Sequence, residues 1–215
     1  MTPLLRSVFK SAGILLAYAI VGTSILAYVY SITHTAIEHN EADARRRLVA
    51  QTLLPNSYNN DLLSNQLSLP VEPLLGTDRA SLAWQARLNN TPVAVVLEAT
   101  APDGYSGKIE LLVGVTADGK LSGVRVVSHH ETPGLGDYID VEKSQWIHIF
   151  DGKSLNNPPD SGWKVRKDGG QFDYMAGATI TPRAVIKAVH HALQYVSQHH
   201  AALFAVQINV KGAKP

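Results

Sequence analysis

A stretch of 23 residues without a charged side chain, SAGILLAYAIVGTSILAYVYSIT at positions 11–33, constrains the fold of this chain more than any other feature. A helix of this length crosses a hydrocarbon core about 30 Å thick. Tyr28 and Tyr30, near its end, match the aromatic residues that gather at membrane interfaces. The alternative is a cleaved signal peptide, but the apolar region of such a peptide is usually about 7–15 residues long. No clear cleavage pattern follows this run, so we expect a retained single-pass anchor.

Charges on either side of the anchor predict its orientation. Arg6 and Lys10 precede it, whereas acidic residues are prominent in the first flank after it. By the positive-inside rule, the N-terminus stays in the cytoplasm and the rest of the protein is exported. The three arginines at 45–47 act in the opposite sense. They lie at the edge of the counted window and open a domain-sized region, which crosses largely regardless of its charge.

The composition excludes several classes of function. Lys and Arg together number 19 and Asp and Glu number 18, so no large basic surface for nucleic acid is implied. The chain has no cysteine, which excludes disulfides, thiolate metal sites, iron–sulfur ligation and a cysteine nucleophile. Cysteine usage does not identify the compartment, because oxidising compartments permit disulfides without requiring them.

The remainder of the sequence divides into a connector and a domain. Residues 34–54 show a helical pattern of apolar positions and predict a stalk, which Pro55-Asn56 ends. A turn-rich stretch of low periodicity follows. We expect the following divisions: a cytoplasmic N-terminus at 1–10, a transmembrane helix at 11–33, a helical stalk and connecting loop at 34–80, the main domain at 81–200 and a C-terminal tail at 201–215.

The main domain begins with strand patterns and ends with a helix pattern. Runs rich in β-branched residues predict strands at 92–102, 108–115 and 121–130. Asp118-Gly119 between the last two is typical of a two-residue hairpin turn with positive φ at both positions. Residues 141–150 predict a helix and residues 163–167 a short strand. Strands followed by helices indicate an α+β fold, an antiparallel sheet with flanking helices.

The stretch DYMAGATITPRAV at 173–185 places two threonines before a helix. Val185, Val189, Leu193 and Val196 recur on one helical face. Pro182 suits the first helical turn, and Thr181 before it suits the N-cap position.

A helix N-terminus offers unpaired backbone N–H groups and the positive end of the helix dipole, both favourable to a phosphate. The small residues Gly177 and Ala178 allow an anion to approach the backbone closely. The residues alone leave two readings open: a threonine that only caps a helix, or a phosphate-binding turn with a hydroxyl beside it.

Other residue patterns do not indicate hydrolytic or metal chemistry. Adjacent histidines on a strand point to opposite faces, and on a helix they diverge by about 100°. The three His-His pairs therefore do not supply two ligands to one ion, and we expect no metal site. The Asp and Glu residues show no spacing that predicts a pair for acid–base catalysis.

The motif D-Y-M-A-G-A-T at 173–179 resembles the flavinylation motif D-x-x-(S/T)-G-A-T of the FMN-binding domain family. In that family the last threonine carries FMN through a phosphoester bond, which a flavin transferase forms by taking FMN from FAD with the help of Mg²⁺. The resemblance implies that Thr179 is the covalent FMN attachment site and Thr181 a capping residue. Ala176 departs from the family's usual Ser or Thr. Asp173, Gly177 and Ala178 match the motif and are implied cofactor contacts.

Three longer stretches, at 97–115, 129–139 and 163–185, resemble the G subunits of Rnf electron-transport complexes, also called Rsx. The loop ETPGLG at 131–136 is specific to this resemblance. It supplies a hydroxyl, backbone amides and an apolar side chain suited to a flavin ring and its ribityl chain. We therefore expect the following further residues to contact the cofactor: Glu131, Thr132, Gly134 and Leu135 from this loop, Tyr105 by stacking, and Lys167, together with Arg166, by its charge.

The resemblance implies an electron-transfer subunit that is a relay within an oxidoreductase rather than a complete enzyme. Its expected place is the bacterial cytoplasmic (inner) membrane, with the main domain in the periplasm. Its partners would be the flavin transferase and the other subunits of a complex that couples electron flow between ferredoxin and NAD⁺ to ion translocation, or that reduces a redox sensor. The alternative is an exported binding or adaptor domain in which Thr179 only caps a helix.

Overall fold

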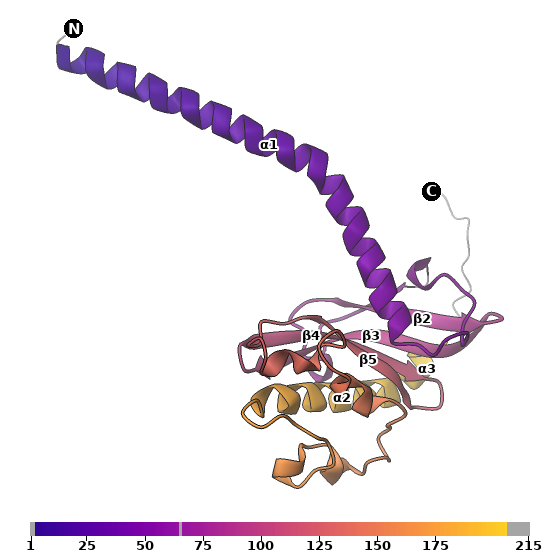
Figure 1. The fold of residues 1–215 in the computed structure, drawn as a ribbon. Coiled ribbons are helices and arrows are strands. Elements are labelled where there is room, and N and C mark those ends of the chain that lie inside the picture. Colours follow the sequence, from indigo (N-terminus) through magenta and orange to yellow (C-terminus); the bar gives the residue numbers. More distant parts are fainter. Residues whose placement is uncertain (1–2, 65, 206–215) are drawn as a thin grey trace. The chain divides into compact units, whose positions relative to one another are not determined.

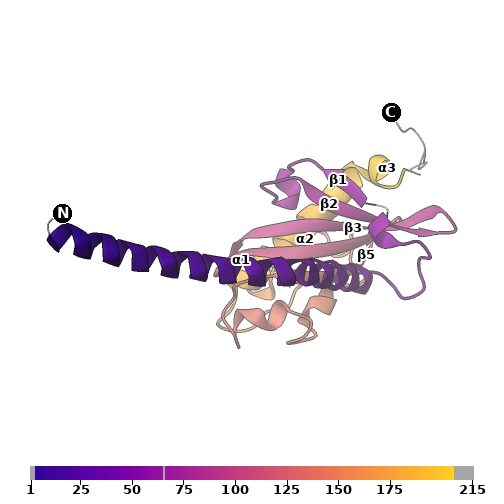
Figure 2. The same ribbon diagram turned by 90° about the horizontal axis from the view of Figure 1, so that it is seen from above.

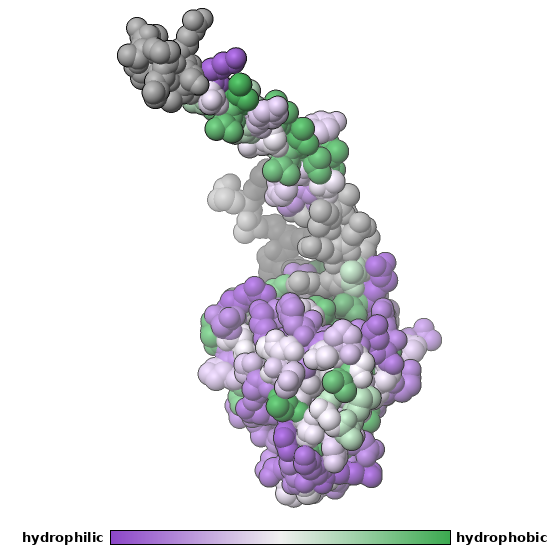
Figure 3. Space-filling model, turned by 60° about the vertical axis from the view of Figure 1, so that its left-hand side comes forward, coloured by the Kyte–Doolittle hydropathy of each residue, from purple (hydrophilic) through white to green (hydrophobic). Residues whose placement is uncertain are grey.

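The computed structural model describes residues 3–64 and 66–205, and these divide at Arg45/Arg46 into two compact units. The first unit is the greater part of helix α1 (Pro3–Gln51). Within it, Phe9–His34 is long and apolar enough to cross a membrane, and the side chains of residues 9–33 are exposed. Figure 3 shows these apolar side chains in green, whereas the visible surface of the second unit is mostly polar.

The second unit contains an antiparallel sheet and the helices that cover it (Figures 1 and 2). Among the described residues, five strands lie in the order β1–β2–β3–β4–β5, which is also their order in the sequence. Their bounds are β1 (Gln66–Leu69), β2 (Ser81–Leu88), β3 (Thr91–Gly104), β4 (Gly107–Thr116) and β5 (Leu121–Ser128). Helix α2 (Ile180–Gln198) and the short helix α3 (His200–Leu203) follow. The predicted α+β fold with an antiparallel sheet is confirmed.

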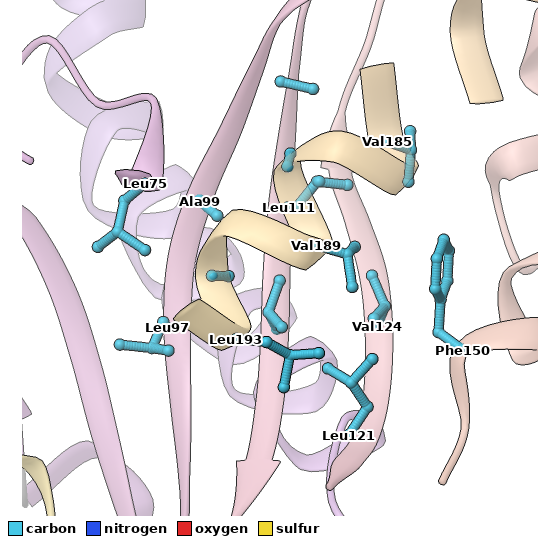
Figure 4. Close-up of a cluster of buried hydrophobic side chains, with 14 of the residues drawn as sticks. Leu75, Leu97, Ala99, Leu111, Leu121, Val124, Phe150, Val185, Val189 and Leu193 are labelled. Carbon is cyan, nitrogen blue, oxygen red and sulfur yellow. The ribbon is translucent and has the colours of Figure 1, made fainter. Parts of the chain in front are cut away.

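Helix α2 covers one face of the sheet and gives the domain its larger core. Val185, Val189 and Leu193, predicted as one helical face, are buried against strand side chains (Figure 4). Alternation along β3 supplies this core, because Val95 and Leu97 point to the helix side while Val96 points to the other face. The sheet is therefore buried on both faces along its central strands.

The last turn of α1 and the loop after it cover the opposite face. Val49 and Leu53 pack there with Trp84 and Leu112 in a second, smaller core. Gly114 and Gly123, paired across β4 and β5, allow a close approach, because a Cβ on Gly114 would lie 2.6 Å from the carbonyl oxygen of Thr52. The Ser122 hydroxyl donates a hydrogen bond to the same oxygen at 2.6 Å. The end of the membrane-anchor helix is thus part of the domain.

Short 3₁₀ helices occupy much of the remaining sequence. They span Leu62–Ser64, Pro73–Leu75, Gly136–Ile139, Trp146–Phe150, Asp160–Gly162 and Arg166–Asp168. The predicted helix at 141–150 is wrong, because only its second half is helical and that half is 3₁₀. The cause lies at Ser144, whose hydroxyl donates to the Tyr138 carbonyl at 2.7 Å and accepts from the Trp146 N–H at 3.0 Å. Such side chain–backbone bonds compete with a continuous helix.

Other local predictions also need correction. The β4–β5 connection is a hairpin, but its loop runs from Ala117 to Lys120 and only Gly119 has positive φ. The two-residue loop with two positive φ values is Asn89-Asn90, between β2 and β3. The expected strand at 163–167 is reduced to a bridge between Val165 and Phe172, because the backbone turns into a 3₁₀ helix at Arg166. Residues 206–215 of the predicted tail lie outside the described residues.

We expect Gly114→Ala to destabilise the domain by about 1–3 kcal/mol, because the new methyl group would lie only 2.6 Å from the Thr52 carbonyl oxygen. The measurement is urea unfolding of the full-length protein in detergent followed by tryptophan fluorescence, since all three tryptophans lie in the second unit. Ser122→Ala is the matched control and should cost only about 0.5–1.5 kcal/mol, the value of one hydrogen bond. Equal midpoints for Gly114→Ala and the unaltered protein would contradict the close-approach argument.

Candidate functional site

A cavity of about 280 Å³ lies where the β3–β4 hairpin, the loop after β5 and the start of α2 meet. Its lining contains both apolar and hydroxyl-bearing side chains. The lining residues are Tyr105, Glu131, Thr132, Leu135, Gly136, Gly177, Ala178, Thr179, Ile180 and Thr181. Three segments that are far apart in the sequence therefore form one site, and it includes the threonine singled out by the sequence motif.

Glu131 connects the three segments that form the cavity. Its side chain is buried, at 4% exposure. Oε1 accepts a hydrogen bond from the Ser106 N–H of the hairpin at 3.0 Å, and Oε2 accepts one from the Thr181 hydroxyl of α2. A buried carboxylate is tolerated when such donors replace the water it has lost. The glutamate thus holds the hairpin and the helix against its own loop.

Glycines make room for this carboxylate. A Cβ on Gly136 would lie 2.7 Å from Oε2, and a Cβ on Gly104 would lie 2.9 Å from Oε1. Both distances are too short for any other residue without rearrangement. Gly136 was not predicted as a site residue, and the sequence signal for it is only its place at the end of ETPGLG.

The loop at 131–136 is closed by its own backbone. The N–H groups of Leu135 and Gly136 donate to the Thr132 carbonyl at 3.1 and 3.0 Å, and Gly134 has φ of 77°. The Gly134 N–H donates to the Asp137 carboxylate at 2.8 Å, so this amide is already occupied. Gly134 does not line the cavity, whereas Leu135, 45% exposed, stands at its rim.

The start of α2 differs from the prediction in one important respect. The helix begins at Ile180, and its N-cap position is Thr179, not Thr181. Thr181 lies inside the first turn with 1% exposure, and its hydroxyl donates to Glu131. The prediction of Thr181 as a capping residue is therefore wrong, because the buried carboxylate provides an acceptor that local sequence cannot reveal.

Thr179 occupies the N-cap position without using its side chain as a cap. Its backbone is in the helical region (φ −80°, ψ −24°), and its hydroxyl makes no capping hydrogen bond. The side chain is half-buried and lines the cavity. Gly177, with φ of 90°, turns the backbone just before it. The first amides of a helix have no intrahelical partner, so this corner presents a hydroxyl and N–H donors together.

Two aromatic residues outside the predicted set hold the turn that precedes Thr179. The Tyr138 hydroxyl accepts from the Met175 N–H at 3.3 Å, and burial raises the pKa of this hydroxyl. The Trp146 indole N–H donates to the Asp173 carbonyl at 2.8 Å. The two rings meet edge to face, with centroids 5.3 Å apart. Nothing in the local sequence links these residues to the motif, since both contacts are long-range.

Besides Gly134, two more of the predicted cofactor contacts, Asp173 and Lys167, do not line the cavity. The Asp173 carboxylate forms an exposed ion pair with Arg166 at 3.0 Å, and its carbonyl is engaged by Trp146. Lys167 is exposed in the neighbouring 3₁₀ helix. Among the residues that the structure describes, no group of three or more His, Cys, Asp or Glu side chains forms a candidate metal site.

The arrangement suits the binding of an anion that carries an apolar group. N–H donors and a hydroxyl lie at a helix N-terminus, which favours a phosphate. Tyr105, Leu135 and Ile180 provide exposed apolar surface beside them. Glu131 is the only carboxylate among the lining residues and both its oxygens accept hydrogen bonds, so the cavity has no second carboxylate for paired acid–base catalysis.

Comparisons with known proteins are consistent with this geometry. The model of the FMN-binding domain matches residues 104–194, which include every residue of the cavity lining, and that of the RnfG N-terminal region matches residues 1–52. The protein is similar to relatives that are named as the G subunits of ion-translocating oxidoreductase complexes. It is 51% identical to one from Pseudomonas aeruginosa over 93% of this sequence and 94% of the relative. The identity is 47% for Cronobacter sakazakii (89% and 91% covered) and 42% for Vibrio atlanticus (97% and 100% covered).

Loss of the hydroxyl should affect stability at Thr181 but hardly at Thr179. We expect Thr181→Val to lower the free energy of unfolding by about 1–3 kcal/mol, because Glu131 stays buried with one donor missing. Thr179→Val should change it by less than about 0.5 kcal/mol, since that hydroxyl caps nothing. Urea unfolding of both variants, produced without any flavin transferase, measures the difference. Equal losses would show that the Thr181–Glu131 bond contributes no more than an ordinary surface contact.

Proposed function

This chain belongs to the family of G subunits of ion-translocating oxidoreductase complexes, and from that premise we propose that it is a membrane-anchored electron-transfer subunit carrying FMN on Thr179 through a phosphoester bond. The observation that carries the proposal is the state of Thr179. Thr179 lines the cavity at the start of α2, where the first helix amides have no intrahelical partner, and its hydroxyl makes no capping bond that attachment would have to break.

The residues of the cavity fit FMN by their chemistry. The phosphate would be held by the first amides of α2 next to Gly177 and Ala178, whose small side chains leave the backbone accessible. The apolar side chains of Tyr105, Leu135 and Ile180 offer surface to an isoalloxazine ring. When bound, the flavin exchanges one or two electrons and so connects carriers of different type.

Attachment is a phosphoryl-group transfer that a separate flavin transferase would perform with FAD and Mg²⁺. The Thr179 oxygen forms a bond to the FMN phosphorus, the pyrophosphate bond of FAD breaks, AMP leaves, and the hydroxyl proton is released. The part of this protein is to present the hydroxyl. A threonine whose oxygen was committed to the helix amides would be a poorer acceptor, so the helical backbone angles at Thr179 are part of the function.

The location proposed for the protein follows from its single apolar span and its flanking charges. Arg6 and Lys10 favour an N-terminus in the cytoplasm and an FMN-binding domain in the periplasm. A covalent bond matters in that compartment, because a dissociated FMN would not be readily replaced there. The relatives' shared name, which describes a subunit of an ion-translocating oxidoreductase complex, supports the other subunits of such a complex as electron partners. Coupling to ferredoxin and NAD⁺, or to a redox sensor, is part of the same proposal.

Flavin labelling should depend on the Thr179 hydroxyl. With FAD and a flavin transferase, the unaltered protein should give a band that fluoresces under ultraviolet light on a denaturing gel and has an FMN-sized mass increment. Thr179→Ser should keep part of the label because the hydroxyl remains, and Thr179→Val should lose all of it. Thr181→Ser is the matched control, because it keeps the donor to Glu131. A colourless band from the unaltered protein would support the alternative of a binding or adaptor domain.

The rate of labelling should also depend on the aromatic support of the turn. Trp146→Phe keeps an aromatic ring but loses the hydrogen bond to the Asp173 carbonyl. One hydrogen bond contributes about 1 kcal/mol, so we expect the initial rate of FMN incorporation to fall about fivefold. Trp163→Phe is the control, because that indole nitrogen has no hydrogen-bond partner. Equal initial rates for these two variants, measured by in-gel fluorescence, would contradict a positioning role for Trp146.

A further inference from the structure

A second cavity, of about 530 Å³, lies where the end of α1 meets the edge strand β5. Polar and apolar residues share its lining. They include Gln51, Asn56 and Tyr58 from the end of α1 and the segment after it, Ser122 and Arg125 from β5, and Asp151 after the 3₁₀ helix Trp146–Phe150. All of them belong to the second unit. The residues proposed to hold FMN take no part in it.

Arg125 is the charged group that distinguishes this cavity. Its side chain is 9% exposed, and its only hydrogen bond within the described residues runs from Nη1 to the adjacent Val124 carbonyl at 2.7 Å. Nε is buried without a partner, and no described carboxylate lies within 4 Å of the guanidinium. A buried charge in this state is costly unless another group pairs with it.

Asp151 also lines the cavity and its charge acts on Arg125, but the two side chains do not form an ion pair. Its carboxylate is already bound to His148 Nδ1 at 2.8 Å. Burial lowers the pKa of Arg125 more than Asp151 raises it. The guanidinium therefore has no paired carboxylate among the described residues, and it retains donors in the fork geometry that matches one.

The surroundings of Arg125 favour a protein carboxylate over a lipid phosphate. The side-chain amides of Gln51 and Asn56 and the Ser122 hydroxyl, which line the cavity, suit the peptide groups around an acidic side chain or a carboxyl terminus.

We propose that this cavity binds a carboxylate of a neighbouring protein, either an acidic side chain or a C-terminus, which pairs with Arg125. The contact anchors the partner at the base of α1, on the sheet face opposite α2, and is separate from the flavin site. The inference uses the proposed function only in choosing membranes that contain the other subunits of the complex.

The test is site-specific photocrosslinking from inside the cavity. Full-length protein with benzoylphenylalanine in place of Tyr58 is produced with the other subunits, the membranes are irradiated, and the adducts are identified by mass spectrometry. We expect one peptide of a neighbouring protein that contains an acidic residue or a free carboxyl terminus. Its yield should fall about tenfold in Arg125→Met, because a charged hydrogen-bonded pair is lost. Replacing the captured carboxylate of the partner by its amide should lower the crosslinking yield about as much as Arg125→Met does. Combining the two changes should lower the yield no further than either change alone.

Controls separate this pairing from effects on folding and on the flavin. Arg79→Met removes an arginine whose side chain is 78% exposed and should leave the yield unchanged. Arg125→Lys keeps the charge without the fork and should give an intermediate yield, which also serves if Arg125→Met does not fold. FMN fluorescence at Thr179 should be the same in every variant, so failure of the proposed function is seen independently. A phospholipid adduct, a yield independent of Arg125, or no adduct at all would overturn the proposal.

Discussion

The buried carboxylate of Glu131 is the interaction on which the functional end of the domain depends. It accepts the Ser106 amide and the Thr181 hydroxyl, so one side chain holds a hairpin and a helix start to the loop from which it extends. The cavity beside it exists because these three segments meet there. Burial makes the arrangement specific, since a carboxylate without both donors would be strongly disfavoured. The hydroxyl of Thr181 is thereby engaged in the structure, whereas that of Thr179 makes no capping hydrogen bond.

The sheet supports the start of helix α2, where Thr179 lies. Helix α2 is packed along its whole apolar face against β3 and β4, which fixes the position of its N-terminus. On the opposite face, paired glycines let the last turn of α1 sit close to β4 and β5. The second compact unit therefore includes the end of helix α1. A flavin on Thr179 would therefore lie at the start of a helix that is packed against the sheet.

The turn before Thr179 shows how such a scaffold positions a small motif. The residues Ala176, Gly177 and Ala178 have little side chain with which to hold themselves, and the nearby Tyr138 and Trp146 bind the backbone just before them. The small side chains leave space for a phosphate, while two aromatic residues that are distant in the sequence hold the backbone of the turn in place. The cavity around Arg125 is built differently, with a buried cation that has no paired carboxylate within the described residues. The first site is suited to a cofactor and the second to a partner.

Local patterns in the sequence were sufficient for the apolar span, three of the five strands among the described residues and the apolar face of α2, because each depends on neighbours a few residues apart. The resemblance of ETPGLG and DYMAGAT placed Glu131, Thr132 and Leu135 beside Thr179. The role of Thr181 was not predictable, because its acceptor lies 50 residues away and local preference favoured a cap. The same limit applies to Tyr138, Trp146 and the glycine pair at 114 and 123.

The sequence by itself determined which groups are present and which segments form elements. Only the tertiary structure decided which hydroxyl is engaged and which is free, since that depends on a buried acceptor brought in by packing.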